Sequence, residues 1–179
     1  MMSNALNLSS LNGGYVTLAD AICARVSKSN IADWCNSLEK HFNLEPYALL
    51  PRKLTKEHII NVDSFGVVFI FSHPHALYDI TGDVSRWFLH EVEFVLSGDN
   101  NVWTDTPPYS LDVINETQDT VIGKLSDDFT DVRESDFMQS FFLDDGKVVA
   151  VQWNRSKKGI QRIIVTHLGS ESDYKCAVI

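Results

Sequence analysis

The sequence predicts an α+β fold, with N-terminal helices packed on a mainly antiparallel sheet that ends in a three-stranded meander. Two patterns predict it. Apolar residues recur at helical spacing in residues 15–62, whereas β-branched, aromatic and alternating runs dominate residues 63–168. We expect the 179 residues to form one domain. Residues 1–14, rich in Asn, Ser and Gly, predict a flexible leader, and the polar residues 169–179 predict a frayed tail.

Two helices are predicted in the N-terminal part, at residues 16–26 and 30–43. The second has its apolar residues at helical spacing: Ile31, Trp34, Cys35, Leu38 and Phe42. Pro46 and Pro51 interrupt the helical pattern, because proline lacks the amide hydrogen that a helix interior needs. Residues 54–62 fit either a short helix or a connector.

The sheet-rich part begins with the β-branched and aromatic run 65–71, which predicts a buried strand. Residues 87–96 alternate, with Val92, Phe94 and Leu96 on one side, and predict a half-buried antiparallel strand. A short helix is expected at about 117–125, capped by Asn115 or Thr117. Three further strands form the meander: Met138–Leu143, Lys147–Trp153 and Ile160–Leu168, joined by tight turns at Asp144-Asp145-Gly146 and Ser156–Gly159.

The charge of the chain is acidic and unevenly distributed. The formal net charge is −9 and the pI is about 5.0, which disfavours binding to nucleic acid phosphates. Residues 79–145 carry most of the acid. The charged residues in 147–168 are all basic: Lys147, Arg155, Lys157, Lys158 and Arg162. The acidic character of the whole chain suits a basic protein partner, and no nucleic acid partner is expected.

The cysteines and the apolar segments predict a cytoplasmic protein with no membrane partner. Three cysteines, Cys23, Cys35 and Cys176, give an odd number without a Cys-x-x-Cys pair, which indicates a reducing compartment. We expect no secretory signal at the start and no membrane-spanning segment. The final Cys176-Ala177-Val178-Ile179 fits the Cys-a-a-X prenylation pattern and is either a lipidation signal or a chance match.

No motif for catalysis, cofactor binding or metal binding stands out in the sequence. His73-Pro74-His75 lacks the spacing of a helical zinc pair, and a surface turn is the simpler interpretation. A Gly-x-Ser-x-Gly nucleophile and a glycine-rich phosphate loop are both missing. Glu91 and Glu93 share a strand face, as solvated surface carboxylates often do. We therefore expect no enzyme activity, no cofactor and no metal.

Residues 88–168 resemble the pattern of small bacterial toxin-immunity proteins. The resemblance follows the strand with Val92 and Phe94, then Pro108-Tyr-Ser-Leu111 and the helix Thr117–Leu125. It ends with the meander around Phe141-Phe-Leu-Asp-Asp-Gly-Lys-Val148. The helix and meander are also similar to those of small outer-membrane assembly lipoproteins. The first resemblance implies a protein that binds and inhibits a toxin.

The sequence thus predicts an immunity protein that inhibits a cognate, basic, secreted toxin or effector domain by stoichiometric occlusion. The predicted partner-binding residues are the acidic cluster and three aromatic anchors: Asp127, Asp128, Asp131, Glu134 and Asp136, with Trp103, Tyr109 and Phe129. The acidic cluster also fits a solvated loop that keeps the chain soluble. Two other functions stay open: a chaperone or adaptor for a secreted protein, and an enzyme with an unrecognised site.

Overall fold

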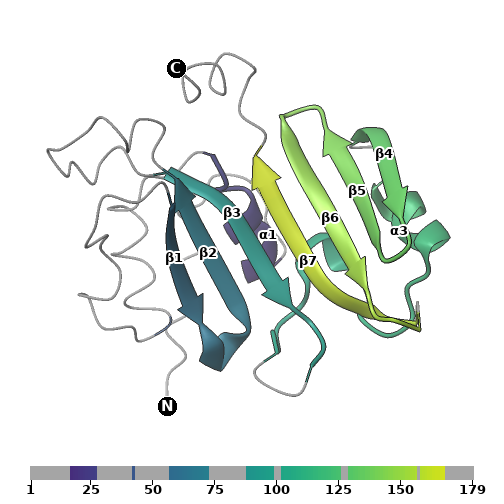
Figure 1. Cartoon of the computed structure of the whole chain (residues 1–179), viewed down its shortest axis with the longest axis horizontal. Coiled ribbons are helices and arrows are strands. Elements are labelled where there is room, and N and C mark those ends of the chain that lie inside the picture. Colours follow the sequence, from purple (N-terminus) through teal and green to yellow (C-terminus); the bar gives the residue numbers. More distant parts are fainter. Residues whose placement is uncertain are drawn as a thin grey trace, which may run out of the picture.

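The computed structural model describes residues 17–27, 42, 57–72, 88–98, 102–125, 129–156 and 158–167. Within these ranges, seven strands form one antiparallel sheet in the order β1-β2-β3-β7-β6-β5-β4 (Figure 1). The strands are β1 (Glu57–Val62), β2 (Val67–Ser72), β3 (Phe88–Val95), β4 (Phe129–Ser135), β5 (Met138–Leu143), β6 (Lys147–Trp153) and β7 (Ile160–His167). The first three strands form one meander and the last four another, and β3 pairs with β7 where the two meet.

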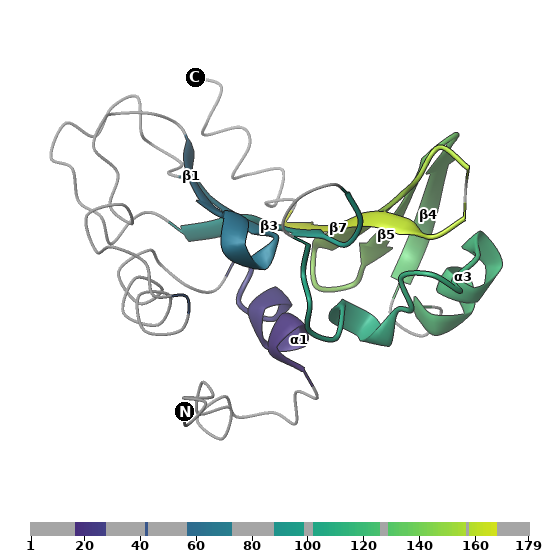
Figure 2. The ribbon, with the colours of Figure 1, turned by 90° about the horizontal axis from the view of Figure 1, so that it is seen from below.

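Helices cover one face of this sheet. The helices α1 (Leu18–Cys23) and α3 (Gln118–Leu125) lie on the same side, with α1 under the middle of the sheet and α3 under its β4 end (Figure 2). Two short 3₁₀ turns, η3 (Asp63–Phe65) and η5 (Pro108–Ser110), complete the described helical structure. No helix in these ranges is long and apolar enough to cross a membrane.

The core lies between the sheet and these helices. Burial alternates strictly along β2 and β6, because successive strand side chains point to opposite faces. The inward side chains are fully buried and include large aromatic residues: Phe69, Phe71, Phe94, Phe141 and Trp153. From the helical side, Ile22 of α1 and Val121 and Leu125 of α3 pack into the same cluster. Outward side chains on both strands are only partly exposed.

The predicted α+β class is wrong, because the described chain is mainly a seven-stranded antiparallel sheet. The helix predicted at 16–26 is limited to the six residues of α1, and Ser27 has a left-handed φ of 71°. The helix predicted at 30–43 lies outside the described residues except for Phe42. Residues 57–62, taken as a short helix or a connector, form β1 instead. The final meander has four strands, because β4 precedes the three predicted ones.

Predictions that depend on local pattern are confirmed. The run 87–96 forms β3 with Val92, Phe94 and Leu96 buried, and the run 65–71 forms β2 from Val67 onward. Helix α3 begins within one residue of its prediction, and the Thr117 hydroxyl accepts a hydrogen bond from the Thr120 amide. The strands β5, β6 and β7 match their predictions, and Gly146 takes the positive φ expected in the Asp-Gly turn.

Candidate protein-binding site

Strand β4 forms one edge of the sheet. Among the described residues it pairs only with β5, and α3 lies behind it and extends past its outer side (Figure 1). None of its seven residues is fully buried, and Phe129 and Val132 are the two that pack against the core. An edge strand presents backbone N–H and C=O groups that another chain can pair with. The outer edge of β4 therefore has no strand partner among the described residues.

A β-bulge interrupts the beginning of β4. The register shifts between Phe129, which pairs with Leu143, and Asp131, which pairs with Phe142. The extra residue is Thr130, whose hydroxyl donates a hydrogen bond to the Phe142 carbonyl at 3.1 Å. A bulge increases the local twist and disrupts the ladder. The regular part of the edge is therefore the five residues Asp131–Ser135.

The pairing register assigns the β4 side chains to the two faces of the sheet. Asp131 and Arg133 lie opposite Phe142 and Ser140 on the face without described helices. The Arg133 guanidinium lies 4.6 Å from the Phe142 ring centroid, and its Nε is 3.6 Å from Asp131 Oδ2. Both charged side chains are well exposed, so this ion pair contributes little to stability. The outer face of β4 thus carries one anion and one cation.

The inner face of β4 carries Val132 and Glu134, opposite Phe141 and Gln139. The Glu134 carboxylate accepts a hydrogen bond from Gln139 Nε2 at 2.9 Å. Gln139 is fully buried and its Oε1 has no hydrogen-bond partner. Glu134 itself is exposed, so its carboxylate remains available to a cation from solvent.

Three of the predicted acidic residues lie in the β4–β5 hairpin, with Asp131 and Glu134 on opposite faces of β4. Asp131 and Glu134 lie on β4, and Asp136 lies in the turn that joins β4 to β5, where it is exposed. They form a strand edge and its hairpin turn, where the sequence suggested a loop. The other two predicted acidic residues, Asp127 and Asp128, lie outside the described residues. We call Asp131, Glu134 and Asp136 the acidic edge.

Of the three predicted aromatic anchors, Phe129 lies on β4, whereas Trp103 and Tyr109 lie between β3 and α3. Trp103 is buried, stacks edge-to-face on Phe94 at 5.0 Å, and donates from Nε1 to the Thr106 carbonyl. Phe129 is half-buried and packs on Phe141 at 5.4 Å. Tyr109 lies in η5 beside α1. The structure therefore uses Trp103 and Phe129 as core residues, and they do not form an aromatic rim around the acidic edge.

Tyr109 is held in a conformation that is rare for a non-glycine residue. Its φ is 60° and that of Ser110 is 53°, both in the left-handed region. The Tyr109 amide donates to Asp20 Oδ1 at 2.7 Å, and the Thr17 hydroxyl donates to Asp20 Oδ2 at 2.8 Å. Asp20 therefore connects the first turn of α1 to η5. This contact fixes the chain path that leads into the loop before α3.

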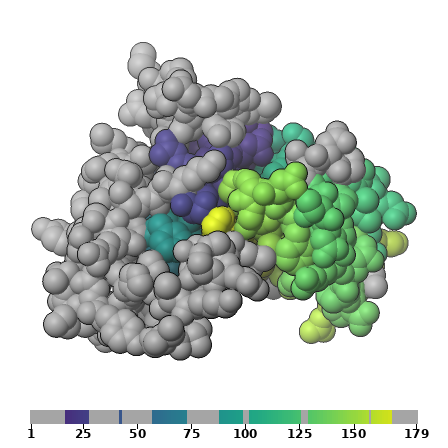
Figure 3. Space-filling view, turned by 90° about the horizontal axis from the view of Figure 1, so that it is seen from above, coloured from purple at the N-terminus to yellow at the C-terminus, as the bar shows by residue number. Residues whose placement is uncertain are grey.

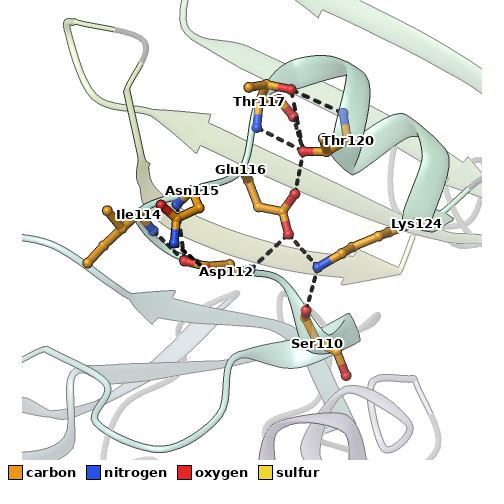
Figure 4. A network of polar contacts seen from close by, with 8 residues as sticks. All are labelled: Ser110, Asp112, Ile114, Asn115, Glu116, Thr117, Thr120 and Lys124. Carbon is orange, nitrogen blue, oxygen red and sulfur yellow. Dashed lines mark hydrogen bonds and ion pairs between the residues drawn. The ribbon is translucent and has the colours of Figure 1, made fainter.

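A buried carboxylate organises that loop (Figure 4). Glu116 accepts hydrogen bonds from the Asp112 amide at 2.9 Å, from Lys124 Nζ at 2.5 Å and from the Thr120 hydroxyl. Lys124 also donates to the Ser110 carbonyl at 2.9 Å. Burial raises the pKa of Glu116, but these hydrogen bonds and the nearby ammonium group outweigh it and keep the pKa below the usual value. Glu116 is therefore ionised at neutral pH and holds α3 to the loop.

The same loop displays an exposed isoleucine. The Asp112 carboxylate accepts hydrogen bonds from the amides of Ile114 and Asn115 and from the Asn115 side chain, which lower the pKa of Asp112 (Figure 4). Ile114 is 78% exposed at the tip. The loop packs against the β6–β7 hairpin, where a Cβ on Gly159 would lie 2.9 Å from the Val113 carbonyl.

His90 and His167 lie at the end of the sheet where β3 begins and β7 ends. Figure 3 looks onto this end, with the end of β7 in yellow beside the beginning of β3 in teal. Burial lowers the pKa of His90, while Glu57 acts to raise it and His167 to lower it further. His90 is therefore mostly neutral at pH 7, and cross-strand burial accounts for it without a ligand.

Lys147 and Cys23 lie on the covered side of the sheet. Lys147 is buried and forms an ion pair with Asp145. The Cys23 thiol is buried in the core, and burial, together with the nearby Asp20, raises its pKa far above the ordinary value. A thiol that stays protonated is a poor nucleophile. In the described ranges, no group of three or more His, Cys, Asp or Glu side chains is placed to hold a metal ion.

Comparisons with known proteins found no match, so the evidence on function is the geometry described above. No protein-family model matches the chain, and no curated protein matches it. No solved structure matches its fold.

Sequence reasoning missed two contributors to the edge, Arg133 and Gln139. Arg133 is a single cation within an acidic run, and its position over Phe142 depends on the β4–β5 register. Gln139 was included in a predicted strand, but its contact with Glu134 depends on the same register. The signal that could have found both is the short hairpin itself, in which Asp136-Phe137 separates two segments with β-branched or aromatic residues.

Proposed function

We propose that this chain is an immunity-type inhibitor, which binds a cognate basic toxin or effector domain through the acidic edge and occludes it. The observation that carries the proposal is the position of two exposed carboxylates on the edge strand β4 and of a third in its hairpin turn. There they are reachable by another protein without any rearrangement of the core.

The electrostatics of the edge favour a basic partner. The β4–β5 hairpin carries three carboxylates, those of the acidic edge, and one guanidinium, that of Arg133, which lies beside Asp131 and over the Phe142 ring. Local charge of one sign speeds the encounter with a partner of the opposite sign and orients it. The effect weakens as salt screens the charges, over a length of about 10 Å at 0.1 M salt.

The helical side next to β4 supplies a rigid support for the edge. α3 packs under β4 and β5 through Val121 and Leu125, and the Glu116 network holds its first turns (Figures 2 and 4). A stable protein complex buries about 800 Å² on each partner, more than a five-residue edge can offer. We therefore propose that the exposed side of α3, including Asp119, completes the contact surface.

The test begins with an affinity purification of the tagged chain from its source cells. The expected result is one stoichiometric protein whose toxic or enzymatic activity is lost when the chain is added at a one-to-one ratio. A partner that gains solubility or export, with no activity lost, would support the chaperone function instead. Recovery of the chain alone would contradict the inhibitor proposal.

Charge reversal then locates the contact. The double variant Asp131→Lys, Asp136→Lys should slow association with that protein by about tenfold or more at low salt. Asp63→Lys is the matched control, because Asp63 is exposed but lies in η3 between β1 and β2. Equal association rates for the double variant and the wild type would show that the acidic edge is not the contact.

A further inference from the structure

We infer that the partner contributes an extended, basic segment that pairs with β4 as an eighth strand of the sheet. This inference rests on the proposed function and specifies how the contact is made. Main-chain hydrogen bonds would supply affinity, and the β4 side chains would select the segment, as in other cases of strand addition.

One side of the β4 backbone has no neighbouring strand among the described residues. In an antiparallel ladder, alternate residues direct their N–H and C=O groups toward the neighbouring strand and the others direct them away. β4 has a neighbour on one side only, so alternate residues of Asp131–Ser135 direct these groups outward. Among the described residues, nothing pairs with them. A segment of five residues spans about 17 Å, within the range of normal strands.

The charged side chains of β4 limit which segment can pair with it. An added strand would place residues next to Asp131 and Arg133 on one face, and next to Val132 and Glu134 on the other. Opposite charges across strands are favourable and like charges are unfavourable. The segment that fits has cations beside Asp131 and Glu134, a further cation near Asp136, and an apolar residue beside Val132. Because Asp131 and Glu134 lie on opposite faces of β4, this basic segment does not alternate strictly. In the order of β4 it has a cation, an apolar residue, a neutral residue, a cation, a neutral residue and a cation.

The bulge argues against a second copy of this chain as the occupant. The regular run Asp131–Ser135 has Arg133 at its centre. Antiparallel self-pairing over the full run would place Arg133 against its own counterpart, which is unfavourable. A register centred on Val132 would bring Asp131 to Arg133, but the bulge at Thr130 limits it to three regular residues. The formal charge of −9 on each chain adds repulsion.

The probe for this inference is the synthetic peptide Lys-Thr-Lys-Thr-Val-Lys, which in antiparallel pairing places its lysines beside Asp136, Glu134 and Asp131 and its valine beside Val132. We expect it to bind the full chain and to slow amide hydrogen exchange on β4. The slowing should affect either Val132 and Glu134, or Asp131, Arg133 and Ser135, because only one set directs its N–H groups outward. Slowing in both sets, or none on β4, would overturn strand addition.

Two further peptides separate main-chain pairing from simple charge attraction. The same sequence is N-methylated either on its odd or on its even residues. Blocking the edge that faces β4 should weaken binding by about tenfold or more, since several hydrogen bonds of about 0.5–1.5 kcal/mol each are lost. Blocking the other edge should leave binding nearly unchanged. Equal effects of the two modifications would contradict the inference, as would a light-scattering mass showing that the chain already dimerises through β4.

The two proposals can fail separately. The peptide measurements do not need the natural partner. If the natural partner is inhibited in a way that depends on the acidic edge, while the peptide leaves β4 exchange unchanged, strand addition is wrong and the inhibitor proposal stands. If the peptide adds to β4 but no inhibited protein is recovered, the edge is a docking strand and the inhibitor proposal is wrong.

Discussion

The two edges of the sheet are stabilised in different ways. β1 fixes its edge with alternate buried side chains, since Ile60 is 5% and Val62 1% exposed while Glu57, Ile59 and Asn61 face solvent. β4 has no comparably buried residue. Its contacts include the β4–β5 ladder, the packing of Phe129 and Val132, and the position of Arg133 over Phe142. They also include the side-chain hydrogen bonds of Thr130 and Glu134.

The different burial of β1 and β4 shows that a sheet can have one edge strand outside the packed core without destabilising that core. Burying an aliphatic side chain contributes about 1.5–3 kcal/mol, so β1 depends on the core and the core on β1. β4 follows α3 and continues through a two-residue turn into β5, and its hydrogen bonds are largely those of a local hairpin. Segments of low local stability are the ones that can exchange partners. An edge strand that binds another protein is expected to resemble β4, which is held mainly by its own hairpin and has no fully buried side chain.

The largest expected effect comes from truncating one inward residue on each edge. Ile60→Ala should lower the free energy of unfolding by about 2–4 kcal/mol, because it leaves a cavity in a packed core. Val132→Ala should lower it by less than about 1 kcal/mol, because Val132 is only half-buried. Urea denaturation of the two variants measures both values. Equal losses would remove the proposed difference between the edges.

A smaller effect is expected from the network that holds α3 under the β4 end of the sheet. Lys124→Met should cost about 2 kcal/mol, because it removes an ammonium group from a buried carboxylate that must then stay charged or take up a proton. Lys158→Met is the control, since Lys158 is exposed in the β6–β7 turn. Thermal unfolding of both variants tests this, and a matching change in Tm would show that the Glu116 contact contributes nothing.

The same network predicts a dependence on pH. The folded-state pKa of Glu116 lies below its unfolded value of about 4.3. Its contribution to stability is therefore fully present above that unfolded value and is lost as the pH falls through the folded pKa. Glu116→Gln should be less stable than the wild type at pH 7, and its stability should fall less steeply below pH ~4. Urea midpoints across this range measure it; parallel curves would exclude Glu116 as the titrating group.

The smallest effect is expected at the outer face of β4. Arg133→Ala should destabilise the fold by about 0.5–1 kcal/mol, the value of an exposed cation–π contact. Arg133→Lys keeps the charge and should recover only part of this loss, since lysine lacks the planar group that stacks on Phe142. Chemical denaturation in low and high salt distinguishes the contributions. A loss above about 2 kcal/mol would mean that β4 is anchored by its outer face.

The elements that the sequence predicted correctly are those with local signals. β3, β6 and β7 alternate or contain β-branched runs, and glycine turns delimit the final hairpins. The two edge strands were missed for different reasons. β1 lies next to helical patterns and becomes a strand by pairing with β2, a contact that its own residues do not reveal. In β4, the bulge places Phe129 and Val132, three residues apart, on the same face, which hides the period of two.

The candidate site was predictable only where its residues are close in sequence. Asp131, Glu134 and Asp136 lie within six residues, so a hairpin keeps them together. Tryptophan dominates many interfaces, which favours Trp103 as an anchor, but its ring packs on Phe94 of β3. Such a contact depends on the path of the chain after β3, and composition alone does not encode that path.

The sheet order also makes the chain separable into two complementary pieces. Among the described residues, the two meanders are joined in the sheet by the β3–β7 ladder, and on the helical side the Tyr109 amide donates a hydrogen bond to Asp20. A cut at the exposed Thr104–Asp105 bond would leave each fragment with one newly uncovered strand. Each would lack the partner that buries Val92 or Val165, so the fragments would be expected to reassemble when mixed, each completing the other's sheet.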